Sequence, residues 1–246
     1  MRITEHFERS GNWLFRWRSY PPLLVLGLSL AAMRSFEYPA GSHFLDLLWE
    51  GAALVVALSG LGIRVATVGC APRRTSGRNT QRQVADSLNT TGMYSVVRHP
   101  LYLGNSLMWL GAAMFPRSFA FAVIILLVCW VYYERIIYCE EAFLEGKFGD
   151  DFRTWARATP AIFPRLSGWV KPALPFSWRH AVKREYRGLF GVLSVFFLLE
   201  IAGDYIARHQ LVFDPVWTVM WVFGLLFFVF VRVLHKRTSL LDVDGR

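Results

Sequence analysis

The 246-residue sequence contains few charged residues, and two long stretches contain none. Charged residues make up 18% of the chain, whereas 54% is hydrophobic and 16% is aromatic. No charge occurs from Ser118 to Tyr133 or from Pro215 to Val231. Uncharged runs of this length are typical of segments that cross a bilayer. They disfavour the alternative, a soluble helical protein with buried core helices.

Cysteine is also scarce, which removes two further classes of protein. The three cysteines, Cys70, Cys129 and Cys139, do not have the spacing of metal ligands, and an odd number provides no disulfide framework. We therefore predict no metal site from these residues. The N-terminus has no short apolar core followed by small residues, so we expect no cleaved signal peptide.

Six apolar segments are candidate membrane spans, and they predict an all-α integral membrane protein with about six transmembrane helices. They are Pro21–Tyr38, Leu45–Val68, Leu101–Phe115, Phe119–Tyr138, Gly188–Ile206 and Pro215–Leu234. The third would cover only about 22 Å as a helix, so its ends must lie at or within the membrane interface.

Basic residues predict the orientation. If six helices alternate from a cytoplasmic N-terminus, 23 of the 27 Lys and Arg residues lie on the cytoplasmic side. Only Arg34, Arg117 and Arg208 lie on the other side, and Arg64 lies inside a span. This asymmetry places both termini in the cytoplasm. The net charge of +9 then indicates contact with anionic lipid and no nucleic acid, because the bases do not form the face of a soluble fold.

The stretch VRHPLYLG places Arg98 and His99 at the cytoplasmic mouth of the third segment. A tight hairpin through Pro116–Ser118 would return Glu140 and Glu141 to the same end, about 7 to 8 Å further into the cytoplasm. Alone, the basic pair is more typical of anchors at a helix end than of a binding site. Together, the two pairs predict a small gap with one cationic and one anionic wall, which suits a zwitterionic ligand.

Two cytoplasmic connections flank this hairpin. Residues 72–89 are polar and are predicted to form a mobile loop. After the hairpin, we expect one helix to end at Gly149 and a short amphipathic helix to end before Pro160, with Phe152 and Trp155 facing the membrane surface. The proline-rich stretch beyond it, FPRLSGWVKPALPF, is expected to form an irregular strap along the interface.

The central part of the chain resembles the isoprenylcysteine carboxyl methyltransferase and phospholipid methyltransferase group. The resemblance covers about Thr91 to Arg165, where many fixed spacings agree at once. The matching residues are Gly92, Tyr94, Arg98, His99, Pro100, Tyr102, Gly104, Glu140, Glu141, Phe148, Gly149, Pro160 and Pro164.

The resemblance implies a membrane methyltransferase that uses S-adenosylmethionine at the cytoplasmic face. It implies catalytic roles for Arg98, which would position an anionic acceptor, and for Glu141, which would serve as a base for an amine acceptor. The implied cofactor-binding residues are Tyr94, His99, Pro100, Tyr102, Gly104, Glu140 and Glu141. The acceptor would be lipid-linked or hydrophobic and would enter between helices from the surrounding membrane lipids.

The sequence departs from this group's usual layout by adding two apolar segments after the strap. Three roles remain open for these two segments: part of a substrate pocket, a dimer contact or an anchor. We divide the chain into an N-terminal membrane segment (1–69), a catalytic core (70–166), and a strap with two C-terminal helices (167–246). Two alternatives remain, a sterol-type reductase that uses NADPH and a non-enzymatic multi-pass protein. We expect a prokaryotic cytoplasmic membrane rather than the endoplasmic reticulum; the sequence does not predict the oligomeric state.

Overall fold

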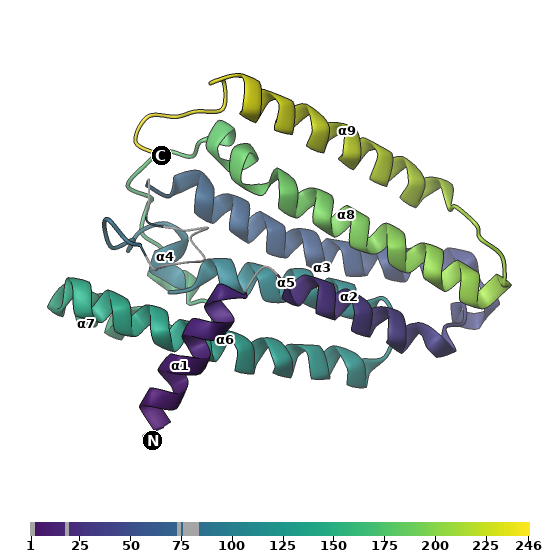
Figure 1. The fold of residues 1–246 in the computed structure, drawn as a ribbon, viewed down its shortest axis with the longest axis horizontal. Helices are drawn as coiled ribbons and strands as arrows, with labels where there is room; N and C mark the ends of the chain where they lie inside the picture. Colours follow the sequence, from purple (N-terminus) through teal and green to yellow (C-terminus); the bar gives the residue numbers. More distant parts are fainter. Residues whose placement is uncertain (1–2, 18–19, 73–74, 76–83) are drawn as a thin grey trace.

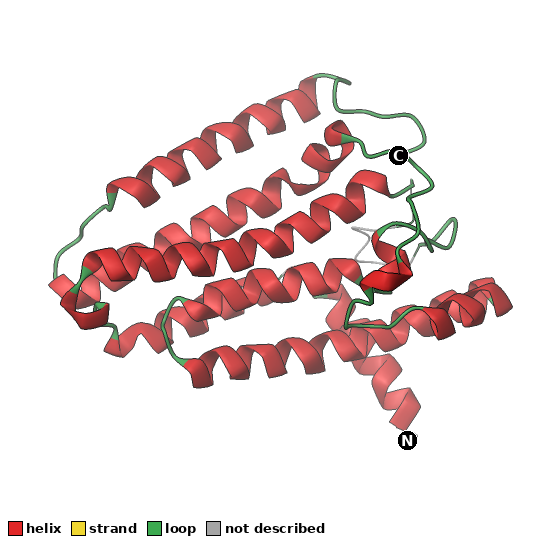
Figure 2. Cartoon of the chain, turned by 180° about the vertical axis from the view of Figure 1, so that it is seen from behind, coloured by secondary structure: helices red, strands yellow, loops and turns green. Residues whose placement is uncertain are grey.

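The computed structural model describes residues 3–17, 20–72, 75 and 84–246, and these residues form helices and connections without a β-strand. The long helices run side by side in one bundle (Figure 1), which Figure 2 shows from behind. The helices are α1 (Ile3–Arg16), α2 (Pro21–Ala32), η1 (Met33–Ser35), η2 (Pro39–Gly41), α3 (His43–Cys70), α4 (Met93–Val96), α5 (Pro100–Met114), α6 (Phe119–Phe148), α7 (Asp150–Ala158), η3 (Leu166–Gly168), α8 (Trp178–Arg208) and α9 (Pro215–Arg237). The predicted all-α fold is confirmed.

Each predicted span coincides with a helix, but some bounds differ. The helix of the first span, α2, ends at Ala32 rather than Tyr38. The turn η1 follows it, and Phe36 and Tyr38 are extended, as is favoured for Tyr38 by the following Pro39. The fifth begins at Trp178 rather than Gly188, where the Ser177 side chain caps a polar first turn. Four described helices, α3, α6, α8 and α9, are long and apolar enough to cross a membrane, and α2 is a shorter apolar helix. The number of crossings stays a prediction.

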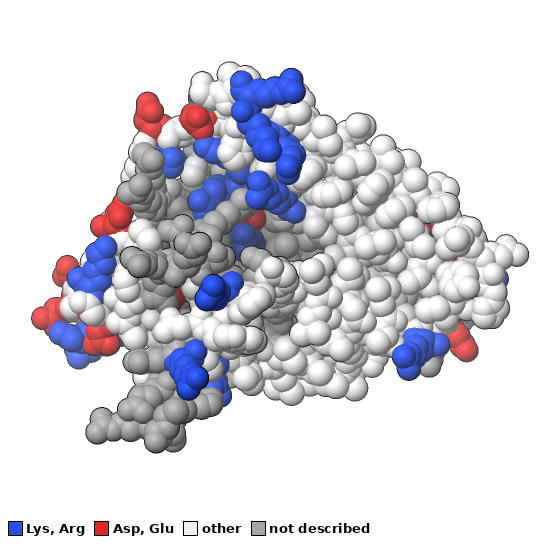
Figure 3. Space-filling view, in the orientation of Figure 1, with Lys and Arg blue, Asp and Glu red and all other residues white. Residues whose placement is uncertain are grey.

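The surface agrees with a membrane protein. Lys and Arg gather at the end that carries α4 and α7, and a broad uncharged band separates them from the other end (Figure 3). Apolar side chains of α6 and α9 are exposed on the band, including Leu127 and Phe223. We call the end with α4 and α7 the site end, and the end where α8 connects to α9 the far end. Both chain termini lie at the site end (Figure 1), but its cytoplasmic orientation stays a prediction.

The predicted hairpin is present as α5 and α6. Arg117 makes the turn with a φ of 57°, and the Ser118 side chain accepts a hydrogen bond from the Phe121 N–H at 3.2 Å. The N-cap starts α6 directly after the turn, so the two helices lie antiparallel.

Helices α3 and α5 pack backbone to backbone through glycine. A Cβ atom at Gly60 would lie 2.3 Å from the Gly104 carbonyl oxygen, and one at Gly111 would lie 2.6 Å from the Ala53 carbonyl oxygen. Gly104 and Gly111, seven residues apart on α5, therefore both face α3, because small residues allow close approach.

The two C-terminal helices belong to the same core as the N-terminal ones. Phe196 of α8 stacks on Trp217 of α9 at 5.6 Å and meets Phe115 edge-on at 5.7 Å. Phe230, by contrast, is 61% exposed on the apolar band. The added hairpin therefore helps to build the bundle, whereas the three-part division of the chain stays a prediction. The predicted loop at 72–89 falls largely on residues 73–74 and 76–83, outside the described residues.

Candidate active site

Arg98 and His99 lie between the one-turn helix α4 and the start of α5. Pro100 occupies the first turn of α5. Backbone N–H groups in the first turn have no partner within the helix, so the N–H that proline lacks is not needed there, and the fixed φ of proline suits a helix. The Arg98 N–H donates to the Pro160 carbonyl at 2.9 Å. The chain that follows α7 therefore holds the basic pair in place.

Glu140 and Glu141 contact this pair directly from α6. His99 Nε2 lies 2.9 Å from Glu141 Oε1, and His99 Nδ1 lies 3.5 Å from Glu140 Oε2. Arg98 Nη1 lies 3.3 Å from Glu141 Oε2. The predicted gap is thus closed by ion pairs. The physical reason is that helical side chains lean toward the helix N-terminus, so both carboxylates reach back along α6 and remove the axial offset.

The imidazole of His99 lies between two carboxylates, Glu140 and Glu141. Burial opposes protonation of the imidazole, but hydrogen bonds and charges from Glu140 and Glu141 outweigh burial and raise the pKa of His99 above its ordinary value. The side chain of His99 is 7% exposed, so this environment is shielded from solvent. With Arg98, the cluster then pairs two cations with two carboxylates.

An aromatic stack lies beside the charged cluster. Tyr102 stacks on His99 with ring centroids 5.8 Å apart and on Tyr133 of α6 at 4.8 Å. Trp109 extends the stack at 5.6 Å from Tyr133. The stack holds the His99 and Tyr102 rings in place beside the charged cluster.

Tyr94 reaches the same cluster from α4. Burial, followed by the charge of Glu140, raises the pKa of the Tyr94 hydroxyl, which keeps it protonated at neutral pH. The strap fixes α4 in position, since the Gly92 N–H donates to the Val170 carbonyl at 2.9 Å and the Val170 N–H donates to Ser95 Oγ at 2.9 Å. The irregular course of the strap is confirmed and its backbone supports α4, whereas its position along the membrane interface stays a prediction.

The prediction that Phe152 and Trp155 face the membrane surface is wrong. The two rings do share one face of α7, with centroids 5.8 Å apart. Phe152 is only 4% exposed, however, and Trp155 Nε1 donates to the Tyr94 carbonyl at 3.0 Å. Because Pro160 bonds to Arg98, the chain after α7 holds this face against the protein.

A second polar network adjoins the site, and sequence reasoning missed it. Arg64 of α3 binds Glu185 of α8 through Nε at 2.9 Å and Nη2 at 2.7 Å, and its Nη1 donates to Asn105 Oδ1 at 2.7 Å. Arg64 was given no role, although a lone arginine inside an apolar span is a signal in itself. Its partner lies 121 residues away, so no spacing could have shown the pair.

Gly104 connects this network to α5. A Cβ atom at Gly104 would lie 2.6 Å from Arg64 Cγ and 2.6 Å from the Gly60 carbonyl oxygen. Glycine at this position lets the Arg64 side chain pass and reach Asn105. The structure thus explains Gly104 by helix packing, and its contact with a cofactor stays a prediction.

Comparisons with known proteins match the region that contains these residues. The family model for phospholipid methyltransferases matches residues 53–151, which include Arg64, Asn105 and the whole charged cluster. Protein-S-isoprenylcysteine O-methyltransferase of Schizosaccharomyces pombe is 35% identical over 79 residues, 32% of this chain and 34% of that protein. No solved structure matches the chain.

Two bacterial relatives match over longer regions. The cobalt-zinc-cadmium resistance protein CzcN of Cupriavidus metallidurans is 35% identical over 167 residues, 63% of this chain and 74% of that protein. The nickel-cobalt-cadmium resistance protein NccN of Alcaligenes xylosoxydans xylosoxydans is 38% identical over 125 residues, 50% of this chain and 55% of that protein. With the matched family model and the apolar helical bundle, these relatives show that the chain belongs to the phospholipid methyltransferase family of membrane proteins.

Proposed function

We propose that the protein transfers a methyl group from S-adenosylmethionine to a lipid-linked or hydrophobic acceptor at the cytoplasmic face of a bacterial membrane. The observation that carries the proposal is the cluster of Arg98, His99, Glu140 and Glu141, which lies within the family match and at the end of apolar helices. S-adenosylmethionine, when bound, supplies an electrophilic methyl group on a sulfonium. It also carries a carboxylate and an ammonium group, which suit a cluster with both charge signs.

The residues present fit such a cofactor. Arg98 Nε is buried and has no hydrogen-bond partner among the described residues, while Nη1 of the same guanidinium holds Glu141. An open guanidinium N–H is suited to a carboxylate or phosphate oxygen. Glu140 and Glu141, with side chains 27% and 23% exposed, offer oxygens to an ammonium group. The faces of Tyr102 and Tyr133 add an aromatic wall next to them.

The residues have different roles for different acceptors. An acceptor that is already anionic needs no general base, so Arg98 would orient it and catalysis would rest on alignment of the reacting groups. An amine acceptor must first lose a proton. Glu141 would then take it, because it is the carboxylate in contact with Arg98 and therefore the base nearest to the proposed acceptor position.

Binding to the purified full-length protein in lipid nanodiscs tests the site. We expect labelled S-adenosylmethionine to bind, and His99→Gln and Glu141→Gln to weaken binding at least 10-fold. Asp151→Asn is the matched control, because Asp151 is an exposed carboxylate of α7. Equal binding by wild type and both site variants would reject the assignment. Competition by NADPH in place of S-adenosylhomocysteine would favour the reductase, and binding of neither would favour a non-enzymatic protein.

A panel of acceptors tests the substrate class. It contains a prenylated cysteine, an isoprenoid phosphate and phosphatidylethanolamine, which present a carboxylate, a phosphate and an amine on lipid tails. We expect one class to gain a methyl group by mass spectrometry in the presence of wild type and not of Arg98→Gln. Transfer to amines alone would favour the base role of Glu141 over the orienting role of Arg98.

The names of CzcN and NccN support a second, compatible function, a contribution to tolerance of divalent metals. Growth of a deletion strain in rising Zn²⁺ and Co²⁺ tests it. We expect wild type to restore growth and Glu141→Gln to fail, which would connect tolerance to methyl transfer. Equal growth with and without the protein would reject this function.

A further inference from the structure

The far end of the bundle buries a second group of acidic residues, apart from the candidate active site. They come from the start of α3, the last turns of α8 and the residue before α9. The five carboxylates and their exposed fractions are Asp46 (1%), Glu50 (1%), Glu200 (2%), Asp204 (1%) and Asp214 (6%). Carboxylates removed from water need cations or protons to offset their lost solvation.

The positive charges around this group do not match it. Among the described residues, ion pairs connect it to two guanidinium groups, Arg117 at Asp46 and Arg208, whose Nε lies 3.7 Å from Asp204. Tyr38 donates to Asp204 as well, but it brings no charge. Five carboxylates therefore face two permanent cations. The other carboxyl groups are neutralised by protons or by a further cation, and one ion of more than one charge can take the place of several protons.

His43 gives this group a nitrogen ligand. Its Nε2 lies 3.5 Å from Asp214 Oδ2 and 3.9 Å from Glu200 Oε1. Ligand atoms around a tetrahedral zinc with bonds of about 2.1 Å are separated by roughly 3.4 Å, so this spacing fits a shared ion. Asp214 uses Oδ1 to cap α9, by accepting from the N–H groups of Val216 and Trp217, which leaves Oδ2 toward His43.

Glu50 supplies the independent sign of a missing ligand. Its Oε2 accepts from Trp217 Nε1 at 2.8 Å, whereas its Oε1 is buried and no described residue donates to it. The carboxyl groups of Glu50 and Glu200 interact, so the two can share either a proton or a metal ion. Ligand atoms of Asp46, Glu50 and Glu200 lie within 4.8 Å of one another, as do those of His43, Glu200 and Asp214. Glu200 belongs to both sets and so connects Glu50 to the histidine set.

We propose that the far end binds one divalent transition-metal ion through His43, Glu200 and Asp214, with Glu50 as a further oxygen ligand. Imidazole with carboxylates suits Zn²⁺, Co²⁺ and Ni²⁺ better than Mg²⁺ or Ca²⁺, which prefer oxygen alone. The inference goes beyond methyl transfer, because none of these residues belongs to the candidate active site. The site is built from residues of α3, of α8 and of the N-cap of α9, which only the folded bundle brings together.

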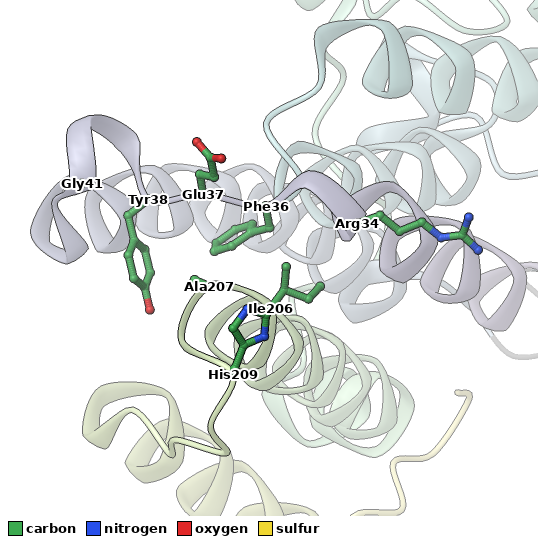
Figure 4. Close-up of a pocket in the computed structure, with 8 residues that line it drawn as sticks. All are labelled: Arg34, Phe36, Glu37, Tyr38, Gly41, Ile206, Ala207 and His209. Carbon is green, nitrogen blue, oxygen red and sulfur yellow. The ribbon is translucent and has the colours of Figure 1, made fainter.

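A surface hollow lies next to the acidic group. It has a volume of about 490 Å³, and its lining includes Phe36, Glu37 and Tyr38 from one segment and Ile206 and His209 from the end of α8 (Figure 4). Tyr38 lines this hollow and also donates to Asp204, so the hollow adjoins the acidic group. The side chain of His43 is 37% exposed, which gives an ion direct access to the nitrogen ligand.

Metal content of the full-length protein tests the proposal. The protein, purified in detergent with a tag that contains no histidine, is stripped with chelator and dialysed against Zn²⁺. We expect about one Zn²⁺ per chain in wild type and in Asp151→Asn, and at least a 10-fold loss of affinity in Glu200→Gln and His43→Ala. In parallel, Co²⁺ should give the visible absorption of a tetrahedral site, and Zn²⁺ should displace it.

A measurement on wild type alone guards against variants that do not fold. Zn²⁺ should raise the thermal unfolding temperature, and Mg²⁺ at the same concentration should not. Wild type that retains no Zn²⁺ and gains no thermal stability would overturn the proposal, as would Glu200→Gln that folds and retains as much Zn²⁺ as Asp151→Asn. Binding of S-adenosylmethionine to the same samples reports on the active site separately, so failure of one proposal is distinguishable from failure of the other.

Discussion

The two ends of the bundle bury charge in different ways. At the site end, Arg98 and His99 pair with Glu140 and Glu141, and Arg64 pairs with Glu185, each at contact distance. At the far end, the five buried carboxylates outnumber the two guanidinium groups that pair with them. A network whose charges match is complete within the protein. A network with an excess of carboxylates is completed by protons or by a further cation.

The two kinds of charge network suit different roles in an apolar bundle. Matched pairs can exchange one partner for a ligand of the same charge, which suits a site where a zwitterion enters and leaves. Unmatched carboxylates gain most from a resident cation. Four changes can break or sharpen this contrast.

The largest effect is expected from Glu141→Gln, which breaks the match at the site end. Glu141 contacts both His99 and Arg98, so the variant leaves two half-buried cations without their shared partner. We expect methyl transfer to fall on the order of 100-fold, consistent with the cost of breaking a buried pair. Initial rates with labelled S-adenosylmethionine check this. Activity within twofold of the Asp151→Asn control would contradict the matched-charge model.

The next effect concerns the pair of Arg64 and Glu185. Arg64→Leu or Glu185→Leu leaves a buried charge alone, and we expect each to lower the free energy of unfolding by about 3 kcal/mol. The double variant should recover much of this loss, because it leaves no unpaired charge. Denaturant titration in one fixed detergent measures all four proteins. Additive losses in the double variant would show that the pair does not act as a unit.

A smaller effect is expected where α3 meets α5 between the two ends. Gly60→Ala places a Cβ atom 2.3 Å from the Gly104 carbonyl oxygen, and such overpacking costs about 1–3 kcal/mol. Gly62→Ala is the matched control two residues away, where nothing lies within 4 Å of the added atom. Thermal unfolding of both variants, with affinities for S-adenosylmethionine and Zn²⁺, checks the result. Equal behaviour of the two variants would argue against close packing of these helices.

The smallest effect is a dependence on pH at the site end. The pKa of His99 is raised in the folded protein, so its stabilising contribution is complete below the unfolded value of 6.5 and is lost as the pH rises through the raised pKa. The difference in Tm between wild type and His99→Gln should therefore be larger at pH 6 than at pH 9. A difference that grows as the pH rises would mean that His99 is stabilised in its neutral form.

The sequence was sufficient to predict the site end and insufficient for the far end. Arg98, His99, Glu140 and Glu141 flank one hairpin, so helix geometry and turn length bring them together by local rules. Their direct contact depends on the lean of side chains, which residue counting ignores. The interpretation of the basic pair as simple anchors does not explain the ion pairs with Glu141 and Glu140.

Long-range packing explains why the sequence did not predict the partners of Glu50 and Arg64. Glu50 and Arg64 lie toward opposite ends of α3, and each is the kind of charged residue inside an apolar span that has a partner. Each is held by a distant helix, Glu50 by Trp217 and Arg64 by Glu185. Glu200 was overlooked inside a predicted span. No periodicity in one segment can show which other segment supplies its partner.

Helix α3 contributes to both ends, with Arg64 in one network and Glu50 in the other. It is one unbroken helix of 28 residues, held against α5 by contacts between backbones. Any free energy transmitted between the two ends through this helix must obey linkage. A metal ion that changes the affinity for the methyl donor by some factor will have its own affinity changed by the same factor when the donor binds.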